Sequence, residues 1–216
     1  DTSLSYARLK GRENRPELGG SYHNYSYTNQ WFALRNVNRW QFSQAHQLFF
    51  GFEAKQVSYD FSSRYEEGKT YDGLFAGGFF SYTVYPFHNL SLSGGLRLDY
   101  YPFSERIHLS PRFSFDWKLT GRLSVNGSYG TFYQQMSLFL LRQHPDNQRL
   151  KDPRAQHMVL GLKYLLGKNI RLTLDVYDKQ YRHLPMAPYA PYYYVMDDVS
   201  GDDANSGYYG PLTDLG

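Results

Sequence analysis

The feature that most constrains this chain is an alternation of apolar and polar side chains that runs twice through residues 109–133. In the first run every second residue from Leu109 to Leu119 is apolar, and the residues between them are polar. A short connection containing Gly121 separates this run from a second alternating run that begins at Leu123. Side chains alternate between the two faces of a β-strand, so the pattern predicts a β-hairpin with one apolar and one polar face.

The same period-two pattern recurs on both sides of the hairpin, so we predict about eight antiparallel strands. They are expected at residues 30–42, 47–61, 71–85, 90–101, 109–118, 123–133, 154–165 and 170–181. Within residues 47–61 the apolar residues move from even-numbered to odd-numbered positions. This change predicts a β-bulge near Lys55. Residues 134–153 form a long insertion whose apolar centre is compatible with either a short strand or a helix.

The connections alternate in length along the chain, and this predicts the topology. Short turns are expected at 43–46, 86–89, 119–122 and 166–169, and longer loops at 62–70, 102–108, 134–153 and from 185 onward. This is typical of an up-and-down barrel whose long loops share one end. We divide the chain into a polar loop at 1–29 that holds the possible end of an earlier strand, barrel strands at 30–184, and a truncated external loop at 185–216.

The choice between lipid and water as the solvent of the apolar faces depends on aromatic and charged residues. Aromatic residues make up 19% of the chain, although its mean hydropathy is −0.62, and they gather near both ends of the predicted strands, as in the two aromatic girdles of a membrane barrel. The polar faces carry full charges, which a water-filled or plugged lumen tolerates. We therefore predict an all-β, antiparallel transmembrane β-barrel whose lumen-facing residues include Arg97, Asp99, Arg112, Asp116, Lys118 and Asp175.

A soluble β-sandwich is the alternative architecture, because its strands also alternate and its outer faces are also charged. Predicted strands of about ten or more residues, and long loops confined to one end, favour the membrane barrel. No run of 18 apolar residues is present, which argues against a helical membrane span and leaves the barrel open.

The composition gives little support to catalysis, metal binding or nucleic-acid binding. The chain has no cysteine, and its net charge of +3 comes from scattered Lys and Arg residues without a basic block. His144, His157 and His183 match no short metal-ligand spacing, and the acidic residues between 197 and 203 lack the order of a calcium loop. With no Gly-x-Ser-x-Gly motif either, we predict no enzyme activity, no cofactor, no metal site and no nucleic-acid partner.

The aromatic cluster near the C-terminal end is the best candidate for ligand contact. Tyrosine offers a large rigid ring together with a hydroxyl group, which suits an external loop that binds a ligand or a protein. Packing of the same loop over the barrel mouth explains the cluster equally well. The ligand-contact candidates are Tyr189, Tyr192, Tyr193 and Tyr194.

Several segments of the chain resemble consecutive barrel strands of TonB-dependent outer-membrane receptors. They are Ser110-Pro111-Arg112-Phe113, then Leu123 to Gly130 followed by Thr131-Phe132-Tyr133-Gln134, then Leu150 to His157 leading into Leu160 to Tyr164, and Val176 to Tyr181 with Leu184-Pro185. The resemblance covers about residues 108–185 and rests on the order and spacing of these segments.

The resemblance implies a barrel of about 22 strands with a plug domain in its lumen, in the outer membrane of a Gram-negative bacterium. Such receptors bind a scarce nutrient and import it with energy from the inner-membrane TonB complex. About eight strands are predicted here, no plug sequence is visible, and no terminal strand ends in an aromatic residue. The chain is therefore interpreted as a mid-barrel portion of a larger receptor.

The first hypothesis for function is part of a receptor and transporter for a siderophore, a vitamin or an oligosaccharide. Its expected partners are outer-membrane lipid, the plug domain, the TonB complex and the nutrient. One alternative is a complete eight-stranded barrel that acts as an adhesin, a structural protein or a small pore. Others are a structural subunit of a larger membrane assembly and a soluble β-rich binding domain.

Overall fold

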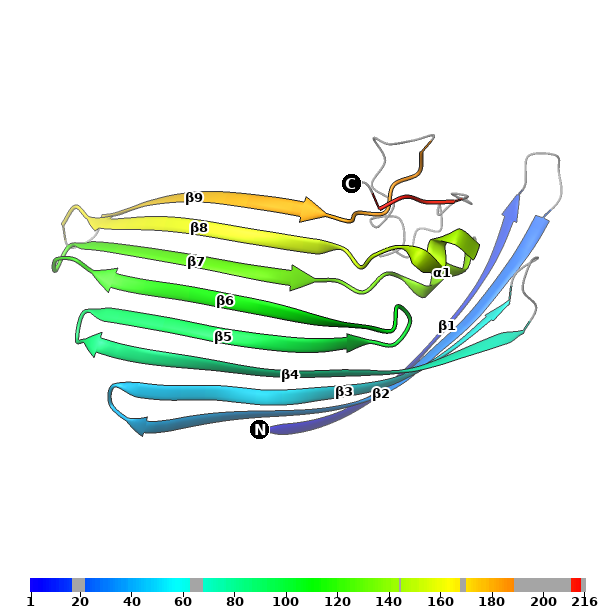
Figure 1. Cartoon of the computed structure of the whole chain (residues 1–216), viewed down its shortest axis with the longest axis horizontal. Coiled ribbons are helices and arrows are strands. Elements are labelled where there is room, and N and C mark those ends of the chain that lie inside the picture. The colour runs from blue at the N-terminus through cyan, green and yellow to red at the C-terminus, as the bar shows by residue number, and fades with distance from the viewer. Residues whose placement is uncertain (17–21, 63–67, 144, 168–169, 189–210, 215–216) are drawn as a thin grey trace.

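The computed structural model describes residues 1–16, 22–62, 68–143, 145–167, 170–188 and 211–214, and these form one antiparallel sheet with a small helical segment at one end (Figure 1). Nine strands pair in the order of the chain, from β1 to β9. Their bounds are β1 Thr2–Pro16, β2 Tyr22–Ser43, β3 His46–Ser62, β4 Lys69–Phe87, β5 Leu90–Tyr101, β6 Arg106–Lys118, β7 Leu123–Tyr133, β8 Arg154–Leu165 and β9 Arg171–Arg182.

The short turns lie together at one end of the sheet and the longer connections at the other, as the sequence predicts (Figure 1). The turn between β6 and β7 is held by one side chain, because the backbone amides of Arg122 and Leu123 donate to Thr120 Oγ1 at 3.1 and 3.0 Å. The neighbouring turn is tied to it by Asn89, whose Nδ2 donates to the carbonyl of Lys118 at 3.0 Å. Such local bonds favour connections between adjacent antiparallel strands.

The strand registers sort the side chains onto two faces. Between β5 and β6, Leu92 lies opposite Phe115 on one face, and Asp99 lies opposite His108 on the other. We call these the apolar face and the polar face. The apolar side chains project from the sheet without cover, and Leu174 on β9 retains 63% of its exposure. The all-β fold and the predicted alternation are therefore confirmed.

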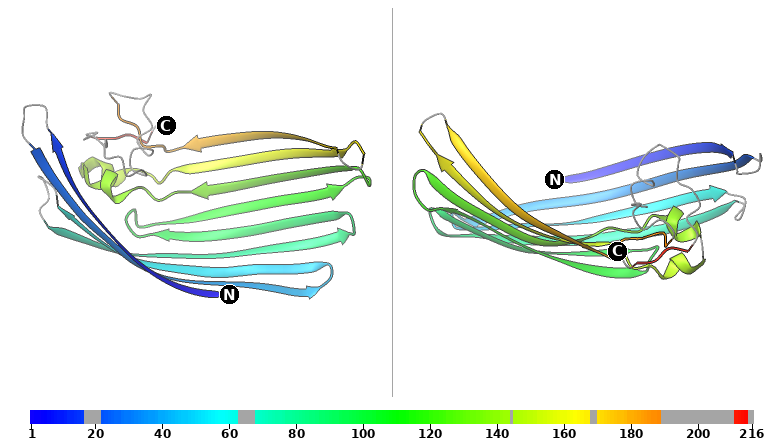
Figure 2. Two further views of the ribbon diagram at one scale, coloured as in Figure 1. Left: turned by 180° about the vertical axis from the view of Figure 1, so that it is seen from behind. Right: turned by 90° about the horizontal axis from the view of Figure 1, so that it is seen from above.

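The sheet is curved and its two edges do not meet (Figure 2). In the described part of the chain β1 pairs only with β2, and β9 pairs only with β8. An unpaired strand edge exposes a row of backbone donors and acceptors, so each edge can pair with a further strand. This is the geometry of a portion of a larger barrel wall. Within the described residues, no helix is both long enough and apolar enough to cross a membrane.

A buried apolar cluster lies at the long-loop end of the sheet, outside the strands. Residues 134–153, which we call the cap, contain the helix α1 (Leu138–Gln143) and the 3₁₀ helix η1 (Pro145–Arg149). The apolar centre of this insertion is thus helical. The buried cluster consists of Met136, Leu140, Leu141, Leu150, Ala187 and Leu212, with Phe103 packed against it.

Residues 1–29, predicted as a polar loop that holds the possible end of an earlier strand, are mostly strand in the structure. Thr2–Pro16 forms β1, and β2 begins at Tyr22, so the sheet has nine strands where about eight were expected. The two strands pair over their full common length, from Thr2 opposite Asn36 to Pro16 opposite Tyr22. Backbone hydrogen bonds hold this ladder, and they do not depend on the apolar alternation by which the other strands were found.

The predicted bulge near Lys55 is wrong. The pairing of β3 with β4 runs without a shift from His46 to Phe61. Val57 therefore lies on the same polar face as Lys55, where it is buried to 7% exposure. Apolar residues occupy odd-numbered positions from Val57 onward because the polar face itself becomes apolar at its long-loop end. There Phe75 and Phe103 pack edge to face, with 5.8 Å between their ring centroids.

We expect a charge on the apolar face to destabilise the full-length protein in a bilayer. Leu96 lies near the middle of β5 on this face, so Leu96→Arg places a cation in hydrocarbon and is expected to cost roughly 2–4 kcal/mol. Urea unfolding in lipid vesicles measures this change. Ser128→Arg on the polar face of β7 is the matched control, and equal destabilisation by both substitutions would contradict the assignment of the apolar face to lipid.

Candidate functional site

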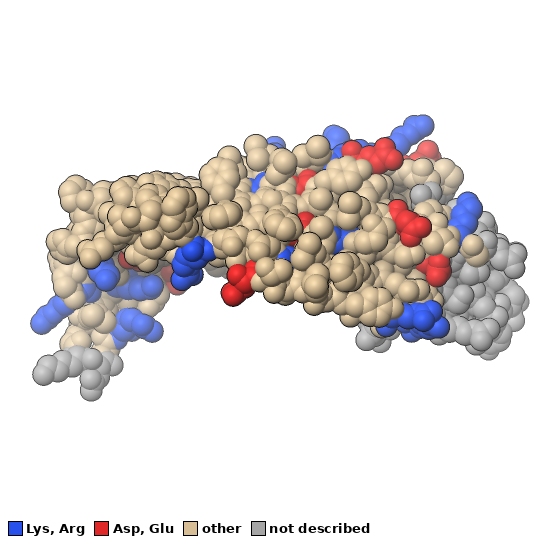
Figure 3. Space-filling model, turned by 90° about the horizontal axis from the view of Figure 1, so that it is seen from below, with Lys and Arg blue, Asp and Glu red and all other residues tan. Residues whose placement is uncertain are grey.

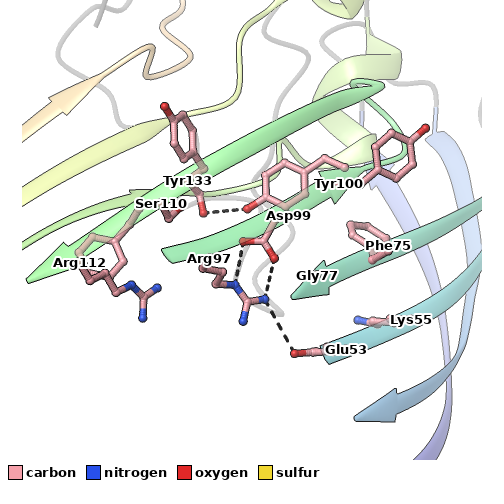
Figure 4. Close-up of a pocket in the computed structure, with 13 residues that line it drawn as sticks. Glu53, Lys55, Phe75, Gly77, Arg97, Asp99, Tyr100, Ser110, Arg112 and Tyr133 are labelled. Carbon is pink, nitrogen blue, oxygen red and sulfur yellow. Dashed lines mark hydrogen bonds and ion pairs between the residues drawn. The ribbon is translucent and has the colours of Figure 1, made fainter. Parts of the chain in front are cut away.

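A charged cluster occupies the polar face of β3 and β5 (Figure 4). Arg97 and Asp99 are two residues apart on β5, so both side chains lie on this face. Arg97 Nε donates to Asp99 Oδ2 at 2.8 Å, and Arg97 Nη2 lies 2.7 Å from Asp99 Oδ1. The same Nη2 lies 4.0 Å from Glu53 Oε2 on β3. The bidentate geometry fixes the guanidinium plane and leaves Glu53 free to accept other donors.

A glycine on the intervening strand makes room for this ion pair. Gly77 on β4 lies directly between Glu53 and Asp99 in the strand register. A Cβ atom at this position would collide with Asp99 Oδ1 and come within 3.1 Å of Arg97 Nη2. The ion pair therefore lies over bare backbone, which only glycine permits.

Arg112 on β6 has a different environment from that of Arg97. Its guanidinium carbon lies 4.6 Å from the centroid of the Phe132 ring, a cation–π arrangement. Among the described residues, no carboxylate lies within ion-pair distance of it. Arg112 also lines three adjoining pockets of the polar face. It is therefore a cation on this face that can take an anionic partner.

The pocket around the ion pair has a volume of about 250 Å³ and carries charges of both signs. Lys55 adds a further cation, whose Nζ lies 4.8 Å above the Trp31 ring. The charged lining residues are Glu53, Lys55, Arg97, Asp99 and Arg112, and Tyr133 and Phe132 complete one side. Because the charges are mixed, this pocket suits polar groups of both signs better than a single ion.

The cap is attached to the sheet through one buried carboxylate. Asp152 Oδ2 accepts from Ser104 Oγ at 2.6 Å and lies 2.8 Å from His108 Nε2, and Asp152 Oδ1 accepts from the backbone amide of Met136 at 3.3 Å. The carboxylate side chain has no exposed surface. Three segments of the chain thus meet at one group, so the cap has a defined position over the long-loop end.

Further contacts connect the cap to β6 and the C-terminal segment. Arg106 Nη1 donates to the carbonyl of Leu150 at 2.8 Å. The buried side chain of Asn147 donates to the carbonyl of Leu140 at 2.8 Å, and its Oδ1 accepts from the amide of Leu212 at 2.8 Å. One asparagine therefore joins α1 to residues 211–214, which also pair with Met186. These bonds satisfy polar groups inside an apolar cluster, where unpaired groups are costly.

The structure brings together three of the six charged residues predicted for the lumen. Arg97, Asp99 and Arg112 line one pocket. The other three lie on the same polar face but nearer the short turns, and they do not line that pocket: Asp116 is opposite Ser91, Lys118 opposite Ser124, and Asp175 opposite Gly161. Their orientation toward a lumen stays a prediction. Charged side chains are scattered among large uncharged areas in Figure 3.

The predicted ligand-contact residues lie outside the described part of the chain. These are Tyr189, Tyr192, Tyr193 and Tyr194. Within the described ranges, no three or more acidic or histidine side chains are grouped so as to hold a metal ion.

Sequence reasoning missed Glu53, Lys55 and Phe132 as parts of the site. A usable signal existed for the first two, because they alternate with the apolar residues Phe52 and Ala54 and so belong to the polar face. No local signal pointed to Phe132. Its role depends on Arg112 lying beside it on the neighbouring strand, which only the register reveals.

Comparison with known proteins agrees with the barrel-wall fold described above. A family model described as "TonB dependent receptor-like, beta-barrel" matches residues 1–208. The uncharacterized protein YddB of Escherichia coli strain K12 is 25% identical over 215 residues, which cover 79% of this chain and 26% of YddB. The chain thus spans about a quarter of the length of that curated relative.

Solved structures share the same fold at low sequence identity. The siderophore receptor PirA from Pseudomonas aeruginosa matches with a TM-score of 0.65 and 11% identity, over 87% of this chain and 41% of PirA. A mutant ferric enterobactin receptor from Pseudomonas aeruginosa, in complex with enterobactin, matches with a TM-score of 0.71 and 13% identity, over 98% of this chain and 36% of that receptor.

We expect any side chain at Gly77 to disturb the ion pair. Gly77→Ala should displace Asp99 from Arg97 and cost roughly 1–3 kcal/mol, the usual range for overpacking. Gly94→Ala is the matched control, since a Cβ atom there would meet nothing within 4 Å. Urea unfolding of the two variants measures the difference, and equal stability would contradict a close fit over β4.

Removal of the buried carboxylate should loosen the cap while the sheet stays folded. Asp152→Ala removes the partner of Ser104, His108 and the Met136 amide, and is expected to cost roughly 1–3 kcal/mol locally. Faster trypsin cleavage after Arg149 and Lys151, both within or beside the loosened segment, is the expected readout. Ser104→Ala removes a single bond and should have a smaller effect. Unchanged cleavage in Asp152→Ala would rule out this anchor.

Proposed function

Since the chain belongs to the family of TonB-dependent receptor-like β-barrels, we propose that it forms part of the wall of a receptor that imports a nutrient across the outer membrane. Proteins of this family are barrels of the outer membrane of Gram-negative bacteria, and that is the location of this chain. They are receptors and transporters that bind their ligands without covalent chemistry. The chain accordingly contributes binding surface and wall.

The observation that carries this proposal is the division of the sheet into an exposed apolar face and a charged, pocketed polar face. Apolar side chains such as Leu98 and Leu174 project from one face without cover. The opposite face carries the Arg97–Asp99 ion pair and the pocket around it. Burial of the apolar side in lipid explains both faces together, because lipid takes the place of a protein core on that side.

We assign the polar face to the lumen of the complete receptor. Arg97, Asp99 and Arg112 would then line the lumen in its middle, and Asp116, Lys118 and Asp175 would line it closer to the short turns. The plug domain and the TonB complex are the protein partners in this proposal. Arg112 lies over the Phe132 ring and forms no ion pair with another described residue. It is therefore a suitable contact for a plug carboxylate.

The imported nutrient is proposed to come from the siderophore, vitamin or oligosaccharide classes. Structures with this fold include receptors described as binding siderophores, among them one in complex with enterobactin. The identity of 11–13% supports a common fold and leaves the ligand to be found by experiment. Because β1 and β9 lie at opposite edges of the sheet, a portion of a larger wall fits better than a closed small barrel.

The test is energised uptake by cells that carry the complete receptor gene. Growth on a limiting nutrient, or uptake of the labelled nutrient, should require both the receptor gene and a functional TonB complex. Deletion of either should abolish uptake, since passage through a plugged barrel needs energy from the inner membrane. Uptake that continues at the full rate without TonB would contradict the proposal and favour a simple pore.

A further inference from the structure

The apolar face of the sheet ends in a basic border where β1 and β2 approach the long-loop end. These two strands pair along their full common length and run together to that end (Figure 1). Along one face of β1, Leu4 and Tyr6 are followed by Arg8 and Lys10 at alternate positions. Arg8 and Lys10, which we call the basic pair, are both exposed, and Tyr6 beside them retains 65% of its exposure. A basic surface thus adjoins an uncovered apolar one.

The strand registers place the basic pair on the apolar face. Directly opposite residues of neighbouring strands share a face, and so do alternate residues of one strand. One row of directly opposite residues crosses the sheet from β1 to β5 and ends at a residue that shares its face with Leu92. The members of this row are Leu4, Leu34, Ala54, Ala76 and Tyr100. The basic pair is on the face of Leu4, because an even number of positions separates each of its members from Leu4.

The basic pair lies at the height where lipid headgroups begin. On β2 the apolar band reaches from Phe42, beside the turn to β3, to Phe32, which is opposite Tyr6. At about 3.4 Å per residue these two rings are roughly 34 Å apart along the strand. A strand tilt of about 40° converts this length to a height of roughly 26 Å, and the apolar band of a membrane barrel is about 25 Å tall. Arg8 and Gln30, opposite each other, occupy the next positions and lie outside the band.

Neither member of the basic pair has an ionic partner among the described residues. No described carboxylate lies within ion-pair distance of Arg8 or Lys10, and neither side chain forms a hydrogen bond with a described residue. Asp60 is two strands away in the row of Lys10, and it accepts from Thr70 Oγ1 at 2.7 Å. The two positive charges are therefore available to an anion from outside the described chain.

Basic residues of the apolar face are confined to the long-loop end. At the other edge of the sheet, Arg154 of β8 lies directly opposite Arg182 of β9. Both are at the long-loop end of their strands, beyond the apolar residues Leu160 and Val176. Among the strand residues that the structure describes, no Lys or Arg is on the apolar face near the short turns. Basic residues at one end only indicate that the membrane surface at that end carries the stronger negative charge.

The chemistry around the basic pair fits a lipid phosphate. The planar guanidinium of Arg8 matches phosphate through two parallel hydrogen bonds, and Lys10 adds a point charge. Gln30 and Thr28, directly opposite them on β2, add neutral hydrogen-bond donors. Next to these polar residues, the exposed rings of Tyr6 and Phe32 offer apolar surface to the acyl chains of the same molecule. A free phosphate ion would use only the polar half of this arrangement.

We propose that the basic pair, with Gln30 and Thr28, forms a binding site for an anionic lipid whose headgroup carries phosphate, in the leaflet at the long-loop end. This inference goes beyond nutrient import, and it rests on the assignment of the apolar face to lipid. The site also fixes the height of the receptor in the membrane, because a phosphate held at Arg8 places Phe32 at the top of the hydrocarbon.

The experiment uses the complete receptor in a neutral detergent, with phosphatidic acid that carries a photoreactive group in its acyl chains. Crosslinked peptides are mapped by mass spectrometry. Wild-type receptor should be labelled within residues 2–10 and 28–34, more strongly than by photoreactive phosphatidylcholine with the same acyl chains. Arg8→Gln combined with Lys10→Gln should reduce labelling of these segments by phosphatidic acid about tenfold or more. Labelling by phosphatidylcholine should not change.

The matched control removes two arginines from the opposite face of the neighbouring strand. Arg35 and Arg39 are exposed on the polar face of β2, where Arg35 is opposite Glu53. Arg35→Gln combined with Arg39→Gln removes the same charge as the test variant, and should leave labelling of the two segments unchanged. Arg8→Lys combined with Lys10→Arg keeps both charges and should keep most of the labelling. Heat-modifiable gel mobility verifies that each variant is folded.

Competition distinguishes a lipid from a free anion. Unlabelled phosphatidic acid should suppress the labelling, whereas inorganic phosphate at the same concentration should not. The inference is overturned if the two photoreactive lipids label the wild type equally, if the double Gln variant is labelled as strongly as wild type, or if inorganic phosphate competes as well as the lipid. A carboxylate supplied to Arg8 by another strand of the complete receptor would give equal labelling by the two lipids, and so also overturns the inference.

These outcomes are separable from those of the import test. TonB-dependent uptake together with equal labelling by the two lipids would overturn the lipid site and leave the proposed import function intact. Preferential labelling by phosphatidic acid that depends on the basic pair, in a receptor without TonB-dependent uptake, would support the site and overturn the import function.

Discussion

The structure depends on backbone hydrogen bonding between neighbouring strands. In hydrocarbon no water is available to pair with an exposed amide or carbonyl, so every strand of a membrane wall must be bonded on both sides. Within the described residues, β2 to β8 each pair with a neighbour on both sides, and β1 and β9 pair on one side. The register shifts of the β2–β3 and β4–β5 pairs lie next to the short turns, at Gln41/Ser43 and Val84/Phe87. Side chains are then free to differ on the two faces, and a strand as polar as β1 pairs in continuous register with its neighbour.

This arrangement reverses the usual position of a protein core. The apolar face of the strands is exposed among the described residues, and Leu174 retains 63% of its exposure, whereas a soluble domain buries such side chains in its interior. Among the described residues, a buried apolar cluster lies beyond the end of the strands, around Leu140 in the cap, and the buried side chains of Asn147 and Asp152 form hydrogen bonds beside it. The cap is therefore a small folded unit at the rim.

Much of the wall was predictable because its signals are local. The alternation in residues 109–133 reports two faces directly, and Arg97 and Asp99 belong together because they are two residues apart on one strand. The partners of this pair were not predictable in the same way. Glu53 comes from β3 and reaches Arg97 only across the bare backbone of Gly77, a relation set by the register of three strands.

The sequence by itself determined the strands with clear alternation, the ends at which short and long connections lie, and the existence of an apolar and a charged face. It did so because these properties depend on neighbouring residues and on the period of a single strand. The tertiary structure decided which part of the polar face is buried. Val57 follows Lys55 on the polar face without any bulge, and it is buried where this face shares a pocket with residues 135–138 of the cap, which is distant in sequence. The pairing of β1 and the anchoring of the cap at Asp152 likewise arise from long-range contacts that no local pattern records.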